Sequence, residues 1–117
     1  MKPQIVFLYG WGPEEGGRLS SLLYMVETAT TMNMNAAVFF FADAAVSAKK
    51  GASAKIGQEI GRRLRILTQN EKVEFYVCEQ AMRKRGLTKE NLENRIKVVG
   101  YATFLETAAS AKTVITI

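Results

Sequence analysis

The residue best suited to chemistry in this chain of 117 residues is its single cysteine, Cys78. It ends a predicted strand over 73–78 and precedes a predicted short helix over 79–85. Backbone N–H groups at a helix N-terminus favour negative charge, so a thiolate would be stabilised at this position. The neighbouring Glu79 opposes that effect, and the basic run over 83–85 supports it. Position alone leaves two interpretations equally open, a reactive thiol or a small buried hydrophobe.

The absence of histidine narrows what the thiol could do. Without imidazole the chain has no histidine base, no Cys–His catalytic pair and no histidine metal ligand. With one cysteine as well, the usual zinc site of cysteines and histidines cannot form. We therefore expect neither a metal nor a cofactor.

Further candidate site residues follow the predicted strands at their carboxyl ends, where the ligands of open parallel sheets gather. Asp43 has the simpler interpretation of a helix cap or turn residue, and Trp11 is expected to wall a site or an interface. Lys49 and Lys50 could attract an anionic substrate, although solvated lysines are the commoner case. The predicted ligand pocket consists of Gly10, Trp11, Gly12, Asp43, Glu79 and Tyr101.

The glycine-rich segment over 10–17, GWGPEEGG, is not a phosphate-binding loop. It lacks the G-x-x-x-x-G-K-S/T pattern, and glutamate stands where G-x-G-x-x-G requires the third glycine. Two carboxylates at the mouth of such a loop would also repel phosphate. The segment is interpreted as a loop that ends one strand and starts the next helix.

The elements that position these residues alternate regularly along the chain. Short apolar runs rich in β-branched and aromatic residues predict strands over 5–9, 36–41, 73–78, 96–100 and 113–117. Apolar residues at helical spacing predict helices over 16–33, 53–69, 79–85 and 101–110. Such alternation predicts one α/β domain over residues 1–117, a three-layer α/β/α sandwich with a five-stranded parallel sheet.

Several local details accompany this prediction. Ser53 is the expected N-cap of the second helix, and Gly86 is expected to end the third one in a left-handed conformation. In the last helix, Phe104, Leu105 and Ala108 are expected to face inward. The connection over 42–54 is either a short helix or a loop.

Composition limits the setting in which the protein acts. The formal net charge is +5 and the sequence pI is about 9.5. The basic clusters over 62–65 and 83–85 lie on amphipathic helices without interleaved aromatic residues, so nucleic-acid binding is not favoured. No apolar run is long enough for a membrane helix or a signal peptide, and one cysteine cannot form an internal disulfide. We expect a cytoplasmic protein that does not bind membranes.

The ordered set of these segments resembles the DsrE/DsrF-like family, which includes sulfur-relay subunits of the TusD kind. The similarity is strongest over 77–87, VCEQAMRKRGL, where the family has a cysteine, a small-residue helix and an Arg-Gly-Leu end. The segments over 97–105 and 111–115 resemble the closing strand, helix and strand of the family. Those over 39–43 and 50–51 resemble its second strand and the following loop. The first loop, over 10–13, does not match the family's usual pattern.

This resemblance implies a Rossmann-like α/β/α sandwich of five parallel strands. It also implies small homo-oligomers, often trimers or hexamers, and a cysteine that accepts persulfide sulfur and passes it to a partner protein. If carried over, that role belongs to Cys78 alone, and it needs no histidine. The rival hypothesis is a non-enzymatic oligomeric binding module in which Cys78 is a packing residue. Apolar residues such as Met25, Met32 and Met34 exceed what so short a chain can easily bury, and methionine is common at adaptable surfaces, so oligomerisation is also expected on these grounds.

Overall fold

The computed structural model describes residues 2–13 and 16–117 and contains one five-stranded sheet. The strands are β1 (Ile5–Tyr9), β2 (Ala36–Phe40), β3 (Val73–Cys78), β4 (Ile96–Val99) and β5 (Thr113–Thr116). All pairings are parallel, and the order across the sheet is β4-β3-β2-β1-β5. The predicted fold class is therefore confirmed, and each predicted strand is correct to within one residue.

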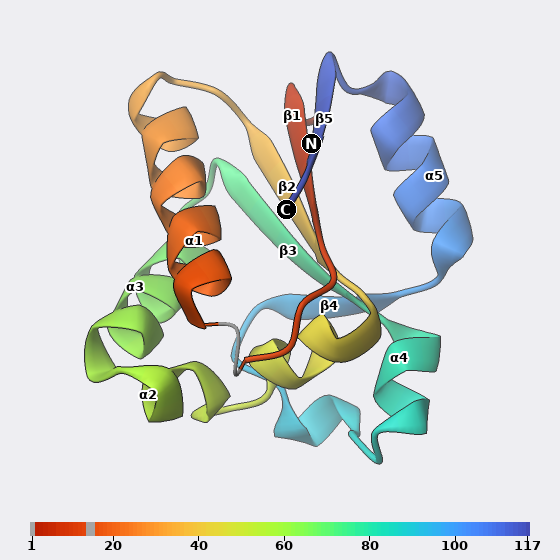
Figure 1. The fold of residues 1–117 in the computed structure, drawn as a ribbon. Helices are drawn as coiled ribbons and strands as arrows, with labels where there is room; N and C mark the ends of the chain where they lie inside the picture. Colours follow the sequence, from red (N-terminus) through yellow and green to blue (C-terminus); the bar gives the residue numbers. More distant parts are fainter. Residues whose placement is uncertain (1, 14–15) are drawn as a thin grey trace.

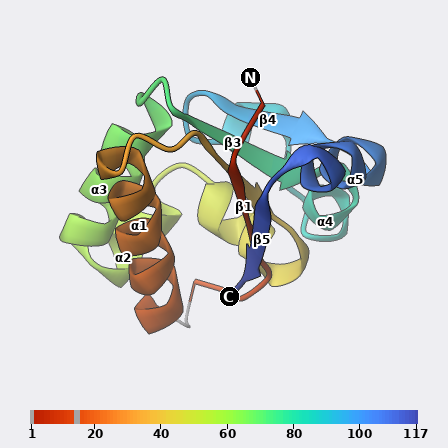
Figure 2. The same ribbon diagram turned by 90° about the horizontal axis from the view of Figure 1, so that it is seen from above.

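Helices and 3-10 turns connect the strands (Figure 1). They are α1 (Gly16–Thr31), η1 (Ala42–Ala48), α2 (Ala52–Ile56), α3 (Gln58–Thr68), α4 (Glu79–Lys84), η2 (Lys89–Asn91) and α5 (Tyr101–Ser110). Figure 2 shows α1, α2 and α3 on one side of the sheet and α5 on the other. The chain steps from β1 to β4 in one direction and returns to β5 in the other. Right-handed crossovers place the helices of the outward and return connections on opposite faces.

The core is divided unequally between the two faces of the sheet. On the side of α1 and α3, a large cluster of buried side chains includes Phe7, Phe40, Leu22 and Leu64. On the side of α5, the buried cluster contains Val6, Ala37 and Phe39. Partly buried side chains surround this smaller cluster: Leu8, Tyr76, Val99, Phe104 and Ala111. The second face thus has a thin cover to which α5 contributes one large aromatic ring.

The helix predicted over 53–69 is wrong as a single element. Gly57 has an extended backbone and separates α2 from α3. Ser53 is not an N-cap, because Gly51 precedes α2 and the Ser53 hydroxyl instead donates to the buried carbonyl of Ser47 at 3.3 Å. The connection over 42–54, left open between helix and loop, is η1 followed by the start of α2.

Predictions for the later helices are mostly correct. Gly86 ends α4 with a φ of 67°, as expected of a left-handed C-terminal position. The last helix has the predicted bounds, and Phe104 packs against the sheet. Leu105 is 62% exposed, so its predicted inward orientation is wrong. The two acidic residues of the first loop, at positions 14 and 15, lie outside the described residues.

Candidate functional site

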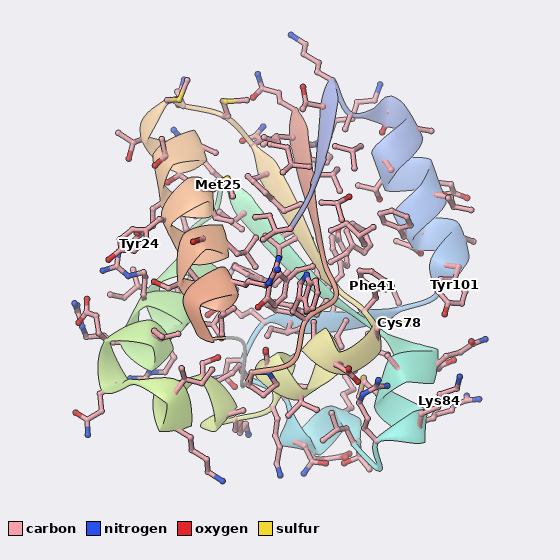
Figure 3. All side chains as sticks on the ribbon, viewed as in Figure 1. Tyr24, Met25, Phe41, Cys78, Lys84 and Tyr101 are labelled. Atoms are coloured by element: carbon pink, nitrogen blue, oxygen red, sulfur yellow. The ribbon has the colours of Figure 1, made fainter. Side chains whose placement is uncertain are left out.

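Two neighbouring strands bring their carboxyl ends and the helices that follow them to one place. Cys78 at the end of β3 pairs in register with Val99 at the end of β4. Helix α4 starts directly after Cys78, and α5 starts at Tyr101 after Gly100. Both helices therefore begin beside the cysteine, and the N-terminus of the ten-residue α5 favours negative charge there. Figure 3 shows Cys78 and Tyr101 near each other at the carboxyl ends of these strands.

A partly open cavity of about 180 Å³ lies in front of Cys78, on the face of the sheet that α5 covers. Its walls come from the ends of four strands, β1 to β4, the segment after β2 and the first turn of α5. The described residues that line it are Leu8, Phe39, Phe40, Phe41, Cys78, Val99, Gly100, Tyr101 and Phe104. None of these residues carries a charge. Cys78 itself is 8% exposed, so access to the thiol is through this cavity.

Aromatic contacts hold the cavity walls in place. The Phe39 ring meets the Phe104 ring edge to face, with centroids 5.0 Å apart, and stacks on Tyr76 at 4.6 Å. The Phe41 ring lies so close to Gly10 that a β-carbon there would be 2.7 Å from the ring. Gly10 thus contributes to the site by making room for Phe41.

Tyr101 contacts the cysteine and partly covers the cavity. Interaction of its hydroxyl with the thiol of Cys78 raises the pKa of Tyr101. A raised pKa keeps the phenol protonated at neutral pH, so the hydroxyl remains a donor when a thiolate forms. The ring is 55% exposed, which places it at the boundary between the cavity and solvent.

The other predicted pocket residues are not brought to this cavity. Glu79 forms an ion pair with Arg83 at 3.3 Å and lines a separate groove, so its carboxylate does not face the thiol. Asp43 accepts a 2.5 Å hydrogen bond from Arg85 and thereby joins η1 to α4. Gly12 is buried in the first loop. Of the predicted set, the cavity includes Cys78 and Tyr101 directly, and Gly10 acts through Phe41.

Trp11 has a different partner. The guanidinium of Arg18 lies 3.9 Å from the centroid of the Trp11 ring, a cation–π contact between the first loop and α1. The side chain is 43% exposed. Among the described residues, Trp11 does not line the cavity in front of Cys78.

The basic clusters are largely engaged with carboxylates. The ion pairs are Arg62–Glu59, Arg63–Glu27, Arg63–Glu59, Arg83–Glu79 and Arg85–Asp43. A recess of about 380 Å³ is lined in part by the exposed Lys49, Lys50 and Lys55. It shares no lining residue with the cavity at Cys78.

Sequence reasoning missed the hydrophobic walls of the cavity. Phe39, Val99 and Leu8 were assigned only to strands, and Phe104 only to a helix face. The alternation of side chains along a strand could have indicated these residues, because residues next to those that point into one face of the sheet point into the other face. That signal becomes specific only when the order of the strands is known.

These features define a Rossmann-like α/β protein with a cysteine in an apolar cavity at the carboxyl end of its sheet. Residues 4–117 match the model of the DsrE/DsrF-like family, and the chain belongs to that family. It is 31% identical over 84 residues to the uncharacterized protein MJ0760 of Methanocaldococcus jannaschii. That match covers 69% of this chain and 30% of the relative's length.

Two solved structures share the fold. The crystal structure of the ychN protein from E. coli superimposes with a TM-score of 0.79 at 21% identity, covering 98% of this chain and 99% of that one. MTH1491 from Methanobacterium thermoautotrophicum, a protein of unknown function, superimposes with a TM-score of 0.71 at 15% identity, covering 97% of each chain. Within the described part of this chain, no helix has the length and apolarity to cross a membrane.

Proposed function

We propose that the protein is a sulfur carrier in which Cys78 accepts a persulfide sulfur and passes it on. The observation that carries this proposal is that the thiol lines a cavity beside Tyr101, whose pKa is raised by interaction with that thiol. A structural cysteine needs neither feature. Membership in the DsrE/DsrF-like family is compatible with a role in sulfur relay.

The site can supply the chemistry without a second protein base. The Cys78 thiolate attacks the outer sulfur of a persulfide, the donor's S–S bond breaks, and its electron pair leaves on the donor's thiolate. A new S–S bond forms on Cys78, so no external oxidant or reductant is needed. The Tyr101 hydroxyl stabilises the attacking thiolate, and the N-terminus of α5 adds to that effect.

Intact-mass measurement after incubation with a persulfide donor tests the role of Cys78. We expect a gain of one sulfur atom on the wild type, removed by reductant, and none on Cys78→Ser. We also expect Tyr101→Phe to load more slowly by about five- to tenfold, because one hydrogen bond to a charged group is lost. No added sulfur on the wild type, in conditions that load an established carrier, would refute the proposal.

We further propose a cytoplasmic homo-oligomer, a trimer or hexamer, that exchanges sulfur with a donor or acceptor protein. Large hydrophobic side chains remain exposed on the single chain, and the α5 side of the sheet is thinly covered. The exposed residues are Trp11, Tyr24, Met25, Met32, Ile66, Tyr101, Leu105 and Val114. Light scattering that gives the mass of one chain at micromolar concentration would refute the oligomer.

The alternative is a binding module in which Cys78 only fills space. The near-complete burial of Cys78 within the main hydrophobic cluster favours this view. Alkylation kinetics of the native protein separate the two proposals. A thiol that reacts orders of magnitude more slowly than a free cysteine, and only upon unfolding, would support the module.

A further inference from the structure

The cavity in front of Cys78 has the chemistry of a site for an uncharged, apolar group. We propose that it binds the apolar body of a small organic persulfide, and that this selects such compounds over inorganic sulfur anions as the donor to Cys78. The inference rests on the proposed sulfur-carrier function, since it names the class of compound from which the sulfur comes.

The cavity lining supports this selection. Leu8, Phe39, Val99 and Phe104 present hydrocarbon surfaces, and Tyr101, which interacts with the Cys78 thiol, completes the lining. An apolar donor body gains free energy in proportion to the surface that it buries here. An anionic donor would lose its hydration and meet no cationic side chain among the described lining residues, and the N-terminus of α5 already interacts with the negative charge of the Cys78 thiolate.

The nearest charged side chains are engaged or lie in other recesses. Glu79 and Arg83 pair with each other outside the cavity, and Arg85 is held by Asp43. Lys84 lines a separate groove that shares only Phe41 and Tyr101 with the cavity. An organic hydropersulfide can shed its charge by protonation and reacts with a thiolate in that neutral form. Thiosulfate keeps its charge, so beside the Cys78 thiolate it would experience like-charge repulsion in an apolar setting.

The size of the cavity limits the donor's body. An apolar protein cavity of about 150 Å³ accommodates benzene. The volume here is about 180 Å³, which fits a phenyl ring or a short alkyl chain and is too small for a nucleotide-sized group. The best donor is thus a small alkyl or benzyl hydropersulfide.

The transfer balances with these reactants alone. The Cys78 thiolate attacks the terminal sulfur of R–S–SH, and the bond between the two donor sulfurs breaks. The products are Cys78–S–SH and the thiolate R–S⁻, which takes a proton from water. The released thiol keeps its apolar body and leaves the cavity by exchange with solvent.

A graded series of donors tests the selection on the wild-type protein. Methyl, propyl and benzyl hydropersulfides and thiosulfate are compared by the initial rate of sulfur loading at low, equal concentration. We expect propyl to exceed methyl by about tenfold, the effect of burying two methylene groups. We expect benzyl to be at least as fast as propyl, naphthylmethyl to bring no further gain, and thiosulfate to be the slowest. Equal rates for methyl, benzyl and thiosulfate would overturn the inference.

A matched pair of nearly isosteric variants localises the effect. Val99→Thr places a hydroxyl in the cavity wall, whereas Val114→Thr places one on the exposed surface of β5. We expect the preference for benzyl over methyl to fall several-fold in Val99→Thr and to stay unchanged in Val114→Thr. The same change in both variants would show that the preference does not arise in this cavity.

Binding of an inert analogue separates this inference from the proposed function. Benzyl methyl sulfide has the donor's body but no transferable sulfur, and its binding can be followed by the shifts of Phe and Tyr ring signals in NMR spectra. Binding without loading by any donor would refute the carrier function and support the apolar specificity of the cavity. Sulfur loading at equal rates from all donors would overturn this inference alone. Absence of both loading and analogue binding would overturn this inference and the carrier function.

Discussion

Replacing Phe104 with alanine tests whether one side chain both anchors α5 and walls the site. The ring packs edge to face on Phe39 and is the large α5 side chain that joins the cluster on this face of the sheet. Loss of a fully buried phenylalanine ring costs about 3–5 kcal/mol. Because Phe104 is half-buried, we expect a loss of about 2 kcal/mol in the free energy of unfolding.

The assay is thermal unfolding followed by circular dichroism, with Leu105→Ala as the matched control on the next residue of α5. We expect Phe104→Ala to lower the midpoint by about 8 °C and Leu105→Ala to change stability by less than about 0.5 kcal/mol. Measurement at two protein concentrations is needed, because the loss of a contact between subunits would make the midpoint depend on concentration.

The site provides an independent readout of the same change. Removing the Phe104 ring opens the cavity, so Cys78 should react faster with a neutral alkylating reagent in Phe104→Ala and at the wild-type rate in Leu105→Ala. Equal destabilisation by the two variants at the lower concentration, with no difference in the rate of alkylation, would refute the assigned orientation of α5.

Two further predictions concern stability. Burial and a hydrogen bond to Glu74 raise the pKa of Tyr76 to about 12, so the folded state holds this proton more tightly than the unfolded state. The stability that this proton contributes is complete below pH 10 and is lost as the pH rises toward 12. Between pH 9 and 12, the free energy of unfolding of Tyr76→Phe should therefore fall by about 1 kcal/mol less than that of the wild type. An equal fall for the two proteins in urea titrations would contradict this. Gly61→Ala should destabilise the protein by about 1–2 kcal/mol, because the new β-carbon would lie 2.7–2.9 Å from atoms of Ala54, backbone atoms included. The control is Gly17→Ala in α1, whose β-carbon would meet no atom within 4 Å. This variant should be neutral or stabilising in the same titration.

The sequence was sufficient to predict the elements but not all of their breaks. The five strands were predicted because each is a short apolar run rich in β-branched and aromatic residues, and helical periodicity predicted the helices between them. The same periodicity continues from Ile56 to Ile60 and conceals the extended Gly57 between α2 and α3. The left-handed backbone of Ala42, with a φ of 49°, is also unmarked by residue type, because glycine or asparagine would be expected there.

The candidate site was predicted in part, for a similar reason. Parallel strands share a carboxyl edge, so the location of Cys78 and Tyr101 at that edge followed from their positions after predicted strands. Asp43 and Trp11 do not join them, since the carboxyl edge is several strands wide and these side chains bind arginines elsewhere, Asp43 with Arg85 and Trp11 with Arg18. Which edge residues meet depends on strand order, which the spacing of apolar residues does not encode.

The return connection from β4 to β5 is what turns a buried cysteine into a candidate site. It crosses the sheet on the face opposite α1, brings Tyr101 to the thiol and places Phe104 over Phe39. The same helix therefore covers the second hydrophobic cluster and forms the cavity in front of Cys78. Because one element serves both purposes, the packing of α5 and the accessibility of the thiol are physically coupled. A contact on the exposed side of α5 is thus expected to change the reactivity of the Cys78 thiol without touching it.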